Sequence, residues 1–224
     1  NREESILDYV NERLVEFNRY LRNRKVALIG LGISNIPLLD YLYNLQAKVT
    51  VFDDRSIEDI PKDIMDKITR YTFEFSFGEN NLAKLNGFDL IFRSPSCMPT
   101  RKELKQAEDS GAIVTSEIEM LMEIAPCKIV GITGSDGKTT TSTLIYEILK
   151  EAGYNVYLGG NIGAPLFTKL NDILPEDIIV LELSSFQLMN MTVSPDIAVI
   201  TNITPNHLNL HSSYEEYIEA KKNI

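Results

Sequence analysis

The sequence predicts an α/β protein built from two parallel-sheet domains. Short apolar runs that suit buried strands alternate with segments of helical periodicity along most of the 224 residues. Glycine-rich turns follow the first such run in each half of the chain, at 30–32 and 131–137. The length allows one or two domains with enough apolar residues for a core. Strands that alternate with helices form parallel sheets, so we expect this architecture in both halves.

The composition is that of an ordinary soluble protein and argues against several classes. Hydrophobic residues make up 44% of the chain and charged residues 24%. The net charge of −10 argues against a nucleic-acid surface, so an anionic ligand would be held locally by loops, helix ends and metal ions. The sequence contains no recognisable signal peptide or membrane-spanning run, and Cys97 and Cys127 lack metal-type spacing. We therefore expect a cytoplasmic protein with free thiols.

Residues 1–24 carry apolar side chains along one helical face and predict a leading helix that packs on the first domain. Strands and helices then alternate. Strands are expected at 25–29, 48–52, 71–77, 88–92 and from 113, and helices from 30–35 to about 44 and over 101–110. The boundary is expected within 115–126, which gives a first domain over 1–115 and a second over 116–224.

Every second residue from Tyr71 to Phe77 is aromatic, and this period of two predicts a strand. Such a row of rings can stack bases in single-stranded nucleic acids. Because the chain is acidic, we instead expect the rings to form a buried face of the sheet.

The first glycine-rich turn has the outline of a dinucleotide-binding fingerprint. Gly30 and Gly32 follow a strand, and Asp53 comes about 20 residues later at the end of the next strand. The third glycine of that pattern is Asn35 here, so we favour a Rossmann-like domain with a ligand other than NAD. Asp53 can accept hydrogen bonds from a ribose or a base, and Arg55 can lie against a base or a phosphate.

The second glycine-rich turn has the features of a phosphate-binding loop (a P-loop). An apolar strand over 128–132 leads into it, and helical periodicity runs from 140 to 150. Such a loop points several N–H groups at one spot, where the helix dipole adds positive charge. Lys138 would reach the β- and γ-phosphates, and Thr139 would offer its hydroxyl to Mg²⁺. A strict nucleotide loop has glycine where this chain has Ile132, so a plain glycine-rich turn with a surface lysine is the alternative.

Polar residues follow or interrupt the later apolar runs, which predict strands at 155–158, 178–183 and 197–201. Glu182 lies near the end of one of them, and a carboxylate at such a buried position must be paired or ligate a metal. His207 follows the last strand, and Ser213 with Glu216 forms a capping box that begins a helix carrying Lys221. On the residues alone, a structural acid, a loop histidine and a surface lysine are the alternatives to a metal site.

Together, five motifs resemble those of the Mur ligase family of peptidoglycan precursor synthesis. They lie, in the family's order, at 133–139, 160–163, 182–188, 201–208 and 217–221. The run Glu-Leu-Ser-Ser-Phe-Gln-Leu at 182–188 discriminates most, since members that add amino acids other than D-glutamate carry different residues after the acid. The resemblance extends from Lys25 over nearly all of the remaining chain. Family members have three domains, so it implies a P-loop-type central domain that is incomplete and a C-terminal domain that is absent.

The resemblance implies an ATP-dependent amide ligase that adds D-glutamate to UDP-N-acetylmuramoyl-L-alanine through an acyl phosphate. It implies a cytoplasmic, monomeric enzyme whose partners are ATP and these two substrates, without nucleic acid or membrane. The C-terminal domain of the family closes over the nucleotide and supplies part of the ATP and D-glutamate contacts. The chain is therefore expected to bind substrates without turnover.

The resemblance also assigns roles to particular residues. The catalytic set is Lys138, Glu182, His207 and Lys221. ATP would be held by Gly134, Ser135, Asp136, Gly137, Lys138, Thr139 and Thr140. The UDP-substrate would be held by Ile33, Ser34, Asp53, Asp54, Arg55, Ser94 and Asn161. One Mg²⁺ would be held by Thr139 and Glu182, and a second by His207 and a carbamate that CO₂ forms on Lys221, since an ammonium group cannot ligate a cation.

Four positions depart from the family pattern. Asn35 and Ser96 replace glycines near the uridine site, and Asn206 and Asn209 replace acids near the second metal. The alternative functions are a sister Mur ligase or a folylpolyglutamate-type ligase, a non-catalytic nucleotide-binding module, and a phosphotransferase acting on a hydroxyl group. The run at 182–188 argues against the other ligases, and folylpolyglutamate-type enzymes also lack a leading uridine-binding domain.

Overall fold

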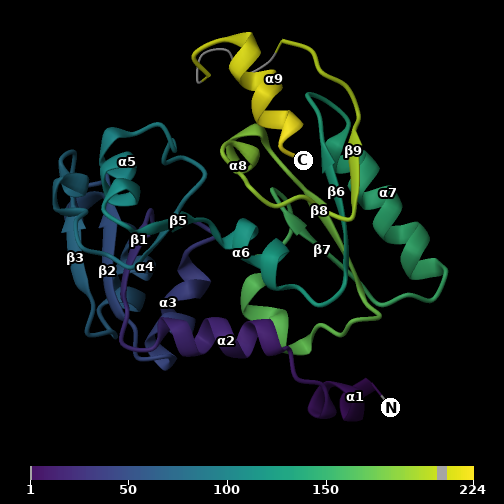
Figure 1. Cartoon of the computed structure of the whole chain (residues 1–224), viewed down its shortest axis with the longest axis horizontal. Coiled ribbons are helices and arrows are strands. Elements are labelled where there is room, and N and C mark those ends of the chain that lie inside the picture. Colours follow the sequence, from purple (N-terminus) through teal and green to yellow (C-terminus); the bar gives the residue numbers. More distant parts are fainter. Residues whose placement is uncertain (1, 206–210) are drawn as a thin grey trace. The chain divides into compact units, whose positions relative to one another are not determined.

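The computed structural model describes residues 2–205 and 211–224 (Figure 1). The chain divides into two compact units. The N-terminal unit is Glu12–Glu117, and the C-terminal unit combines the residues up to Asn11 with Ile118–Ile224. Each unit contains one parallel sheet, which confirms the predicted α/β class. The assignment of a UDP-substrate domain to 1–115 and of an ATP domain to 116–224 stays a prediction.

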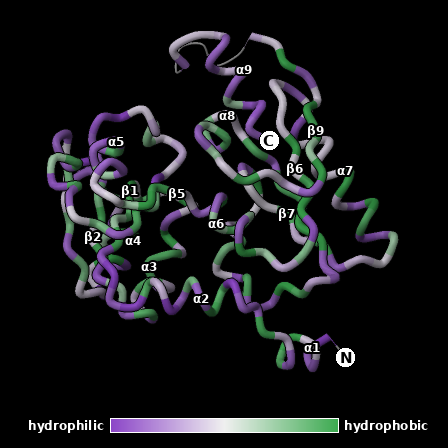
Figure 2. The backbone as a smooth tube through the Cα atoms, viewed as in Figure 1, coloured by the Kyte–Doolittle hydropathy of each residue, from purple (hydrophilic) through white to green (hydrophobic). Residues whose placement is uncertain are grey.

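The N-terminal unit is built on a five-stranded parallel sheet of order β3-β2-β1-β4-β5. The strands are β1 (Lys25–Ile29), β2 (Lys48–Asp53), β3 (Glu74–Phe77), β4 (Leu90–Arg93) and β5 (Ile113–Thr115). The helices are α2 (Glu12–Leu21), α3 (Ile36–Asn44), α4 (Lys62–Ile68) and α5 (Lys102–Asp109), with 3₁₀ turns η1 (Ile57–Asp59) and η2 (Asn81–Lys84). Leu82 of η2 and Leu104 of α5 pack on the same sheet residues, and Figure 2 shows β1 and β5 as hydrophobic. This apolar core fixes the strand ends that carry the predicted UDP site.

The predicted leading helix over 1–24 is in fact two helices, α1 (Arg2–Asp8) and α2. The chain breaks at residues 9–11 because this segment is bonded within the C-terminal unit. The amide of the buried Asn11 donates to the carbonyl of Ile124 at 3.0 Å. Arg2 forms an ion pair with Asp177 at 2.8 Å. The expectation of one helix on the first domain is therefore wrong: α1 belongs to the C-terminal unit and α2 to the N-terminal unit.

The aromatic row at the edge strand β3 is only partly buried. Tyr71 and Phe73 precede the strand, and Phe73 is buried, whereas Phe75 is 36% exposed. The rings of Tyr71 and Phe73 stack with centroids 4.9 Å apart, and Tyr43 packs against both. The predicted buried aromatic face thus holds for Phe73 alone, because the outer residues lie at the open edge of the sheet.

The helix α4 was not predicted.

The C-terminal unit is built on a four-stranded parallel sheet of order β7-β8-β6-β9. The strands are β6 (Lys128–Thr133), β7 (Val156–Gly160), β8 (Ile178–Glu182) and β9 (Ile197–Ile200). Helices α6 (Glu117–Ile124), α7 (Lys138–Glu151), α8 (Ser185–Leu188) and α9 (Tyr214–Lys222) and the 3₁₀ turn η3 (Phe167–Asp172) surround it. Helix α7 lies against the sheet through Ile145 and Leu149, which pack on β6 and β8 residues. Figure 1 shows α7 running alongside β6 and β9.

Parallel pairing brings the carboxyl ends of these strands to one edge. Ile132 of β6 pairs with Glu182 of β8, and Glu182 pairs with Gly160 of β7. On the other side Thr133 pairs with Ile200 of β9. Ligands of open parallel sheets bind at this edge, so the register alone places the phosphate loop, Glu182 and the β9 end within one region.

The structure adjusts several predicted boundaries in the C-terminal unit. Helix α7 begins at Lys138, directly after the last loop glycine, rather than at 140. The short helix α8 was not predicted, although Ser184 and Gln187 form its capping box. At α9 the Ser213 hydroxyl accepts from the amide of Glu216, but the Glu216 carboxylate accepts from the amide of Ser212, so only half of the predicted capping box forms. Within the described ranges, no helix has the length and apolarity needed to cross a membrane.

Candidate active site

The phosphate loop joins β6 to α7 and takes a shape that requires glycine at two positions. Gly134 has φ +150°, and a Cβ on it would lie 1.9 Å from the hydroxyl oxygen of Thr201. Gly137 has φ +78° and is the residue that caps α7. Any side chain at Gly134 would push the loop away from the end of β9. The glycines therefore let the loop pack closely on the sheet edge.

Thr201 and Asn202, which follow β9, hold the loop through hydrogen bonds. The Ser135 amide donates to the carbonyl of Asn202 at 3.0 Å, and the Asp136 amide donates to the Asn202 side chain at 3.0 Å. The Asn202 amide group returns a bond to the carbonyl of Asp136, as does the hydroxyl of Thr201. The amides of Ser135 and Asp136 are thus already bonded. The amides of Lys138, Thr139 and Thr140 open helix α7, and an anion at its N-terminus would meet these N–H groups.

Lys138 folds back over the loop that precedes it. Its Nζ donates to the carbonyl oxygens of Gly134 and Ser135, both at 2.9 Å. These bonds hold the ammonium group at the α7 N-terminus, where the helix amides also point. The arrangement concentrates positive charge at one place, as the binding of nucleotide phosphates requires.

Glu182 ends β8 beside the loop with only 2% of its surface exposed. One carboxylate oxygen accepts from the hydroxyl of Thr139 at 2.7 Å, and the other accepts from the side-chain amide of Asn161 at 2.9 Å. A Cβ on Gly160 would lie 2.1 Å from the carbonyl oxygen of Glu182, so β7 can pair this closely with the end of β8 only with glycine at position 160. The structure thus brings together three predicted site residues from different elements.

The Thr139–Glu182 pair fits a magnesium ion. Mg²⁺ prefers oxygen ligands and usually binds through one or two carboxylates together with substrate phosphates. A hydroxyl and a carboxylate lie side by side here at the end of a phosphate loop. Within residues 2–205 and 211–224, no three His, Cys, Asp or Glu side chains cluster as metal ligands. The donor set therefore suits an ion that takes its remaining ligands from a bound nucleotide and water.

Lys221 of α9 is buried and forms hydrogen bonds with the same loop and the end of β6. Its Nζ donates to the Gly134 carbonyl at 2.8 Å and to the Thr133 hydroxyl at 3.2 Å, and it lies 4.8 Å from the Tyr217 ring. Burial, and secondly the charge of Lys138, lowers the pKa of Lys221 to about 8. A larger fraction of this side chain is therefore neutral amine at pH 7 than for an ordinary lysine.

His207 and the departures Asn206 and Asn209 lie outside the described residues. Of the predicted second metal site, the structure therefore describes Lys221 alone. Its surroundings are the carbonyl and hydroxyl acceptors of the loop, which suit an N–H donor. A carbamate nitrogen keeps one N–H, so it can retain one of these bonds. The second metal and the carbamate stay predictions.

The predicted UDP residues gather at the carboxyl edge of the first sheet. The buried carboxylate of Asp53 accepts from the amide of Leu31 at 2.8 Å and from the guanidinium of Arg55 at 2.7 and 2.8 Å. Burial on its own raises the pKa of Asp53, but the bonds from Arg55 and Leu31 outweigh it, so the net pKa is lowered. Arg55 also donates to the carbonyl of Leu31 at 3.2 Å. Asp53 and Arg55 thus hold the turn after β1 in place, with the exposed Ile33 and the half-buried Ser34 at its tip.

Two departures from the family pattern form hydrogen bonds at this edge. The buried Asn35 donates from its amide to the carbonyls of Ile29 and Gly30 at 2.8 and 3.0 Å. The hydroxyls of Ser94 and Ser96 lie 2.9 Å apart. Both replacements of glycine therefore tie the strand ends to the loops that follow them. Asn161, the last predicted UDP residue, belongs to the C-terminal unit.

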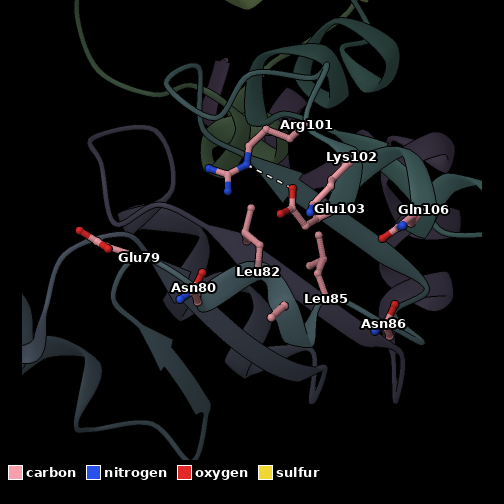
Figure 3. Close-up of a pocket in the computed structure, with 10 residues that line it drawn as sticks. Glu79, Asn80, Leu82, Leu85, Asn86, Arg101, Lys102, Glu103 and Gln106 are labelled. Atoms are coloured by element: carbon pink, nitrogen blue, oxygen red, sulfur yellow. Dashed lines mark hydrogen bonds and ion pairs between the residues drawn. The ribbon is translucent and has the colours of Figure 1, made fainter.

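A separate cavity of about 290 Å³ lies between η2 and α5 of the N-terminal unit (Figure 3). Leu82 and Leu85 line its floor, and Figure 3 shows Arg101 and Glu103 on one side with Glu79 and Asn80 on the other. Arg101 and Glu103 form an ion pair at 3.4 Å. None of the predicted UDP residues lines this cavity.

Sequence reasoning missed four residues that support the site. Asn202 and Thr201 bond the phosphate loop, Tyr217 shares a hydrogen bond of 2.8 Å with the Ser135 hydroxyl, and Asn81 donates to the carboxylate of Asp54 at 3.0 Å. The spacing of Tyr217 and Lys221 was an available signal, since residues four apart share a helix face. Thr201 and Asn202 lie in the motif at 201–208, but their loop partners are many residues away in sequence, as Asp54 is from Asn81, so no local pattern predicts these bonds.

Comparisons with known proteins agree with this geometry. Residues 24–116 match the family model of the Mur ligase MurD-like N-terminal domain, and residues 132–224 match that of the Mur ligase middle domain. The chain is 49% identical over 209 residues to the UDP-N-acetylmuramoylalanine–D-glutamate ligase of Clostridium acetobutylicum, covering 93% of this chain and 45% of the relative. It is 50% identical over 215 residues to the ligase of that name from Clostridium tetani, covering 96% of this chain and 47% of the relative.

A solved structure shows the same fold. It is the UDP-N-acetylmuramate:L-alanyl-gamma-D-glutamyl-meso-diaminopimelate ligase from Neisseria meningitides, with a TM-score of 0.53 at 15% identity, over 90% of this chain and 68% of that one. The chain spans about half the length of the curated relatives it matches. With a MurD-like N-terminal domain followed by a Mur ligase middle domain, the chain belongs to the Mur ligase family.

Proposed function

We propose that the protein is an ATP-dependent ligase that joins D-glutamate to UDP-N-acetylmuramoyl-L-alanine in peptidoglycan precursor synthesis. Relatives with that printed activity are about half identical to this chain across both units. The observation that carries the proposal is the contact of Glu182 with Thr139 and Asn161. This contact joins the phosphate loop to the motif that separates D-glutamate ligases from their sister enzymes.

The chemistry requires activation of a carboxylate. A carboxylate repels nucleophiles and has no good leaving group at neutral pH. Its oxygen would therefore attack the γ-phosphorus of ATP, which breaks the bond to the β-phosphate oxygen and forms an acyl phosphate and ADP. The amine of D-glutamate would then add to the acyl carbon and expel phosphate, which leaves an amide. Positioning and charge neutralisation dominate such a phosphoryl transfer.

The residues of the C-terminal unit suit these tasks. The amides of the first turn of α7 and the ammonium group of Lys138 would bind the β- and γ-phosphates. Thr139 and Glu182 would hold one Mg²⁺, and the carbamate of Lys221 with His207 a second. When bound, these ions would offset the negative charge that develops on the phosphate oxygens. Asn161 would orient the muramoyl substrate from its place beside Glu182.

The N-terminal unit would hold the uridine diphosphate end of the substrate. The turn at 32–34 lies at the N-terminus of α3, where the helix dipole favours a diphosphate. Asp54, Arg55 and Ser94 lie at the same sheet edge and would contact the nucleoside. Both cysteines are free, which supports the cytoplasmic location that we propose. We further propose that the chain acts as a monomer and that turnover requires the third domain of the family.

A ligand titration of the 224-residue chain tests the binding part of the proposal. UDP-N-acetylmuramoyl-L-alanine at about 100 times its Kd should stabilise the domain that binds it by roughly 3 kcal/mol. Stabilisation by NADH but not by the uridine compound would contradict the proposal. Tight nucleotide binding without any response to the uridine compound would favour a nucleotide-binding module or a phosphotransferase.

A further inference from the structure

A buried imidazole lies between helix α8, which follows the strand ending in Glu182, and helix α9, which carries Lys221. The His211 side chain is 0% exposed, and its Nε2 lies 2.9 Å from the hydroxyl of Ser185, which is 2% exposed. Its Nδ1 lies 3.3 Å from a carboxylate oxygen of Glu216. This second distance allows an ion-pair contact, although the direction is not that of an aligned hydrogen bond. The three side chains form a Ser–His–Glu row that is buried at Ser185 and His211 and partly exposed at Glu216.

Aromatic rings fix the imidazole from two further sides. The Phe186 ring stacks on it with centroids 4.7 Å apart and planes at 12°. The Tyr217 ring meets it edge-on, with centroids 5.3 Å apart and planes at 73°. An imidazole held by two polar groups, one stacked ring and one edge-on ring has little freedom to rotate. The site is therefore built for a fixed orientation of His211.

A Ser–His–carboxylate row is also the arrangement of hydrolase active sites, where the serine attacks a bound substrate. Ser185 does not suit that role, because its hydroxyl is buried and a nucleophile must reach its substrate. Ser185 is the first residue of α8, a helix of only 4 residues whose N-terminus is stabilised by a capping box. The row is therefore better explained as a support than as a reaction centre.

The row connects α8, which follows the strand that ends in Glu182, with α9, which carries Lys221. Ser185 begins α8, three residues after Glu182 in the sequence. Glu216 and Tyr217 lie in the first turn of α9, and Lys221 lies one turn beyond Tyr217 on the same face. The Tyr217 hydroxyl bonds Ser135 of the phosphate loop, and the Lys221 ammonium bonds Gly134 of that loop. A shift of His211 would thus move α9 relative to the β8 end and the loop.

We propose that His211 is a positioning residue that sets the place of Lys221 relative to Glu182 and the phosphate loop. The proposal rests on the ligase function above, and it adds to that function a role for a residue outside the ligand set. His211 acts through α9 and Ser185 and touches no substrate. Its loss should therefore slow the chemical step more than it weakens substrate binding, since small misplacements of reacting groups reduce rate strongly.

The test uses the full-length natural protein with three variants. His211→Phe keeps a ring for the aromatic contacts and removes both nitrogens. His211→Gln keeps a polar group that can reach Ser185, and Ser185→Ala removes a single oxygen and should fold in any case. Glu119→Gln is the control, because it alters a polar side chain of the C-terminal unit that bonds Thr192 and does not belong to the Ser–His–Glu row.

We expect kcat of His211→Phe to fall about tenfold to a hundredfold, with KM for D-glutamate and for the uridine substrate changed less than about threefold. His211→Gln should recover part of this loss, and Ser185→Ala should show a smaller loss. A second readout is independent of activity: the rate at which a reductive-methylation reagent labels the buried Lys221 should rise severalfold in His211→Phe and stay unchanged in the control.

The outcomes separate this inference from the proposed function. If the unsubstituted protein shows no D-glutamate-dependent turnover, the proposed function is wrong. If the unsubstituted protein turns over and all three variants match it in kcat and in Lys221 labelling, the positioning role is wrong. If KM rises and kcat is unchanged, His211 affects substrate binding alone, and that result also overturns the proposal.

Discussion

Lys138 and Lys221 donate from their ammonium groups to the same carbonyl oxygen, that of Gly134, at 2.9 and 2.8 Å. Two like charges converge on one backbone atom, and the charge of Lys138 contributes to the lowered pKa of Lys221. The two ammonium groups repel each other, and an anion bound nearby would offset this repulsion. With Lys221 in its ammonium form, the arrangement thus favours binding of an anion at the loop, and the predictions below follow from this and from neighbouring contacts.

Replacing Lys138 by Met should weaken the binding of Mg²⁺-ATP by at least about tenfold, because a charge-assisted contact to phosphate is lost. The fold should be unaffected, since the repulsion between the two lysines is relieved. Calorimetry with the 224-residue chain measures the affinity. Lys150→Met is the control, as it removes the same charge from the exposed end of the same helix. Equal affinities in the two variants would contradict the prediction.

Replacing Glu182 by Gln should remove the part of nucleotide affinity that depends on Mg²⁺. The amide preserves shape and can still accept from Thr139, but it is a far weaker ligand for a hard cation than a carboxylate. We expect ADP to bind alike with and without Mg²⁺ in the variant and more tightly with Mg²⁺ in the unsubstituted chain. Glu151→Gln at the end of α7 should leave the metal effect intact. A metal effect of normal size in Glu182→Gln would show that the ion lies elsewhere.

Replacing Gly134 by Ala should destabilise the C-terminal unit by several kcal/mol, because its Cβ would overlap the Thr201 hydroxyl and the backbone conformation disfavours a side chain. Gly153 has φ +90°, but open space surrounds the methyl group that Gly153→Ala would add. This variant should therefore lower the free energy of unfolding by only about 1 kcal/mol. The double variant Gly134→Ala/Thr201→Ala should recover part of the loss, since it removes the overlapping oxygen. Denaturant unfolding of the unsubstituted chain, these three variants and the single variant Thr201→Ala measures these differences. Additive effects would argue against the overlap.

The Asp53 carboxylate should stabilise the N-terminal unit in a pH-dependent way. Its pKa is lowered in the folded chain, so its contribution is present above the unfolded pKa and is lost as pH falls through the folded pKa. Asp53→Asn should therefore lower the free energy of unfolding by about 1–3 kcal/mol at pH 7. The difference from the unsubstituted chain should shrink below about pH 4. Hydrogen exchange of the β1 and β2 amides in both chains measures this difference in the free energy of unfolding. The exposed Asp63→Asn should show little effect at either pH.

The sequence predicted most strands well, because they are short apolar runs such as 25–29 or 178–183 with a polar residue or glycine at or near the end. The strand predicted over 71–77 is shorter in the structure and spans Glu74–Phe77. The resemblance assigned Thr139 and Glu182 to one Mg²⁺, and the contact between these two side chains agrees with that pairing. The roles of the predicted site residues stay predictions. The break between α1 and α2 was missed because the partner of Arg2 lies 175 positions away. The bonds of Asn202 and the position of His211 depend in the same way on distant packing.

The central claim is the ligase reaction, and one assay tests it most directly. The full-length natural protein is incubated with ATP, Mg²⁺ and UDP-N-acetylmuramoyl-L-alanine, and phosphate release is followed with and without D-glutamate. We predict release that depends on D-glutamate, with one amide product formed for each phosphate, and its loss in Glu182→Gln. Release that is the same without D-glutamate, or the absence of an amide product, would contradict the account.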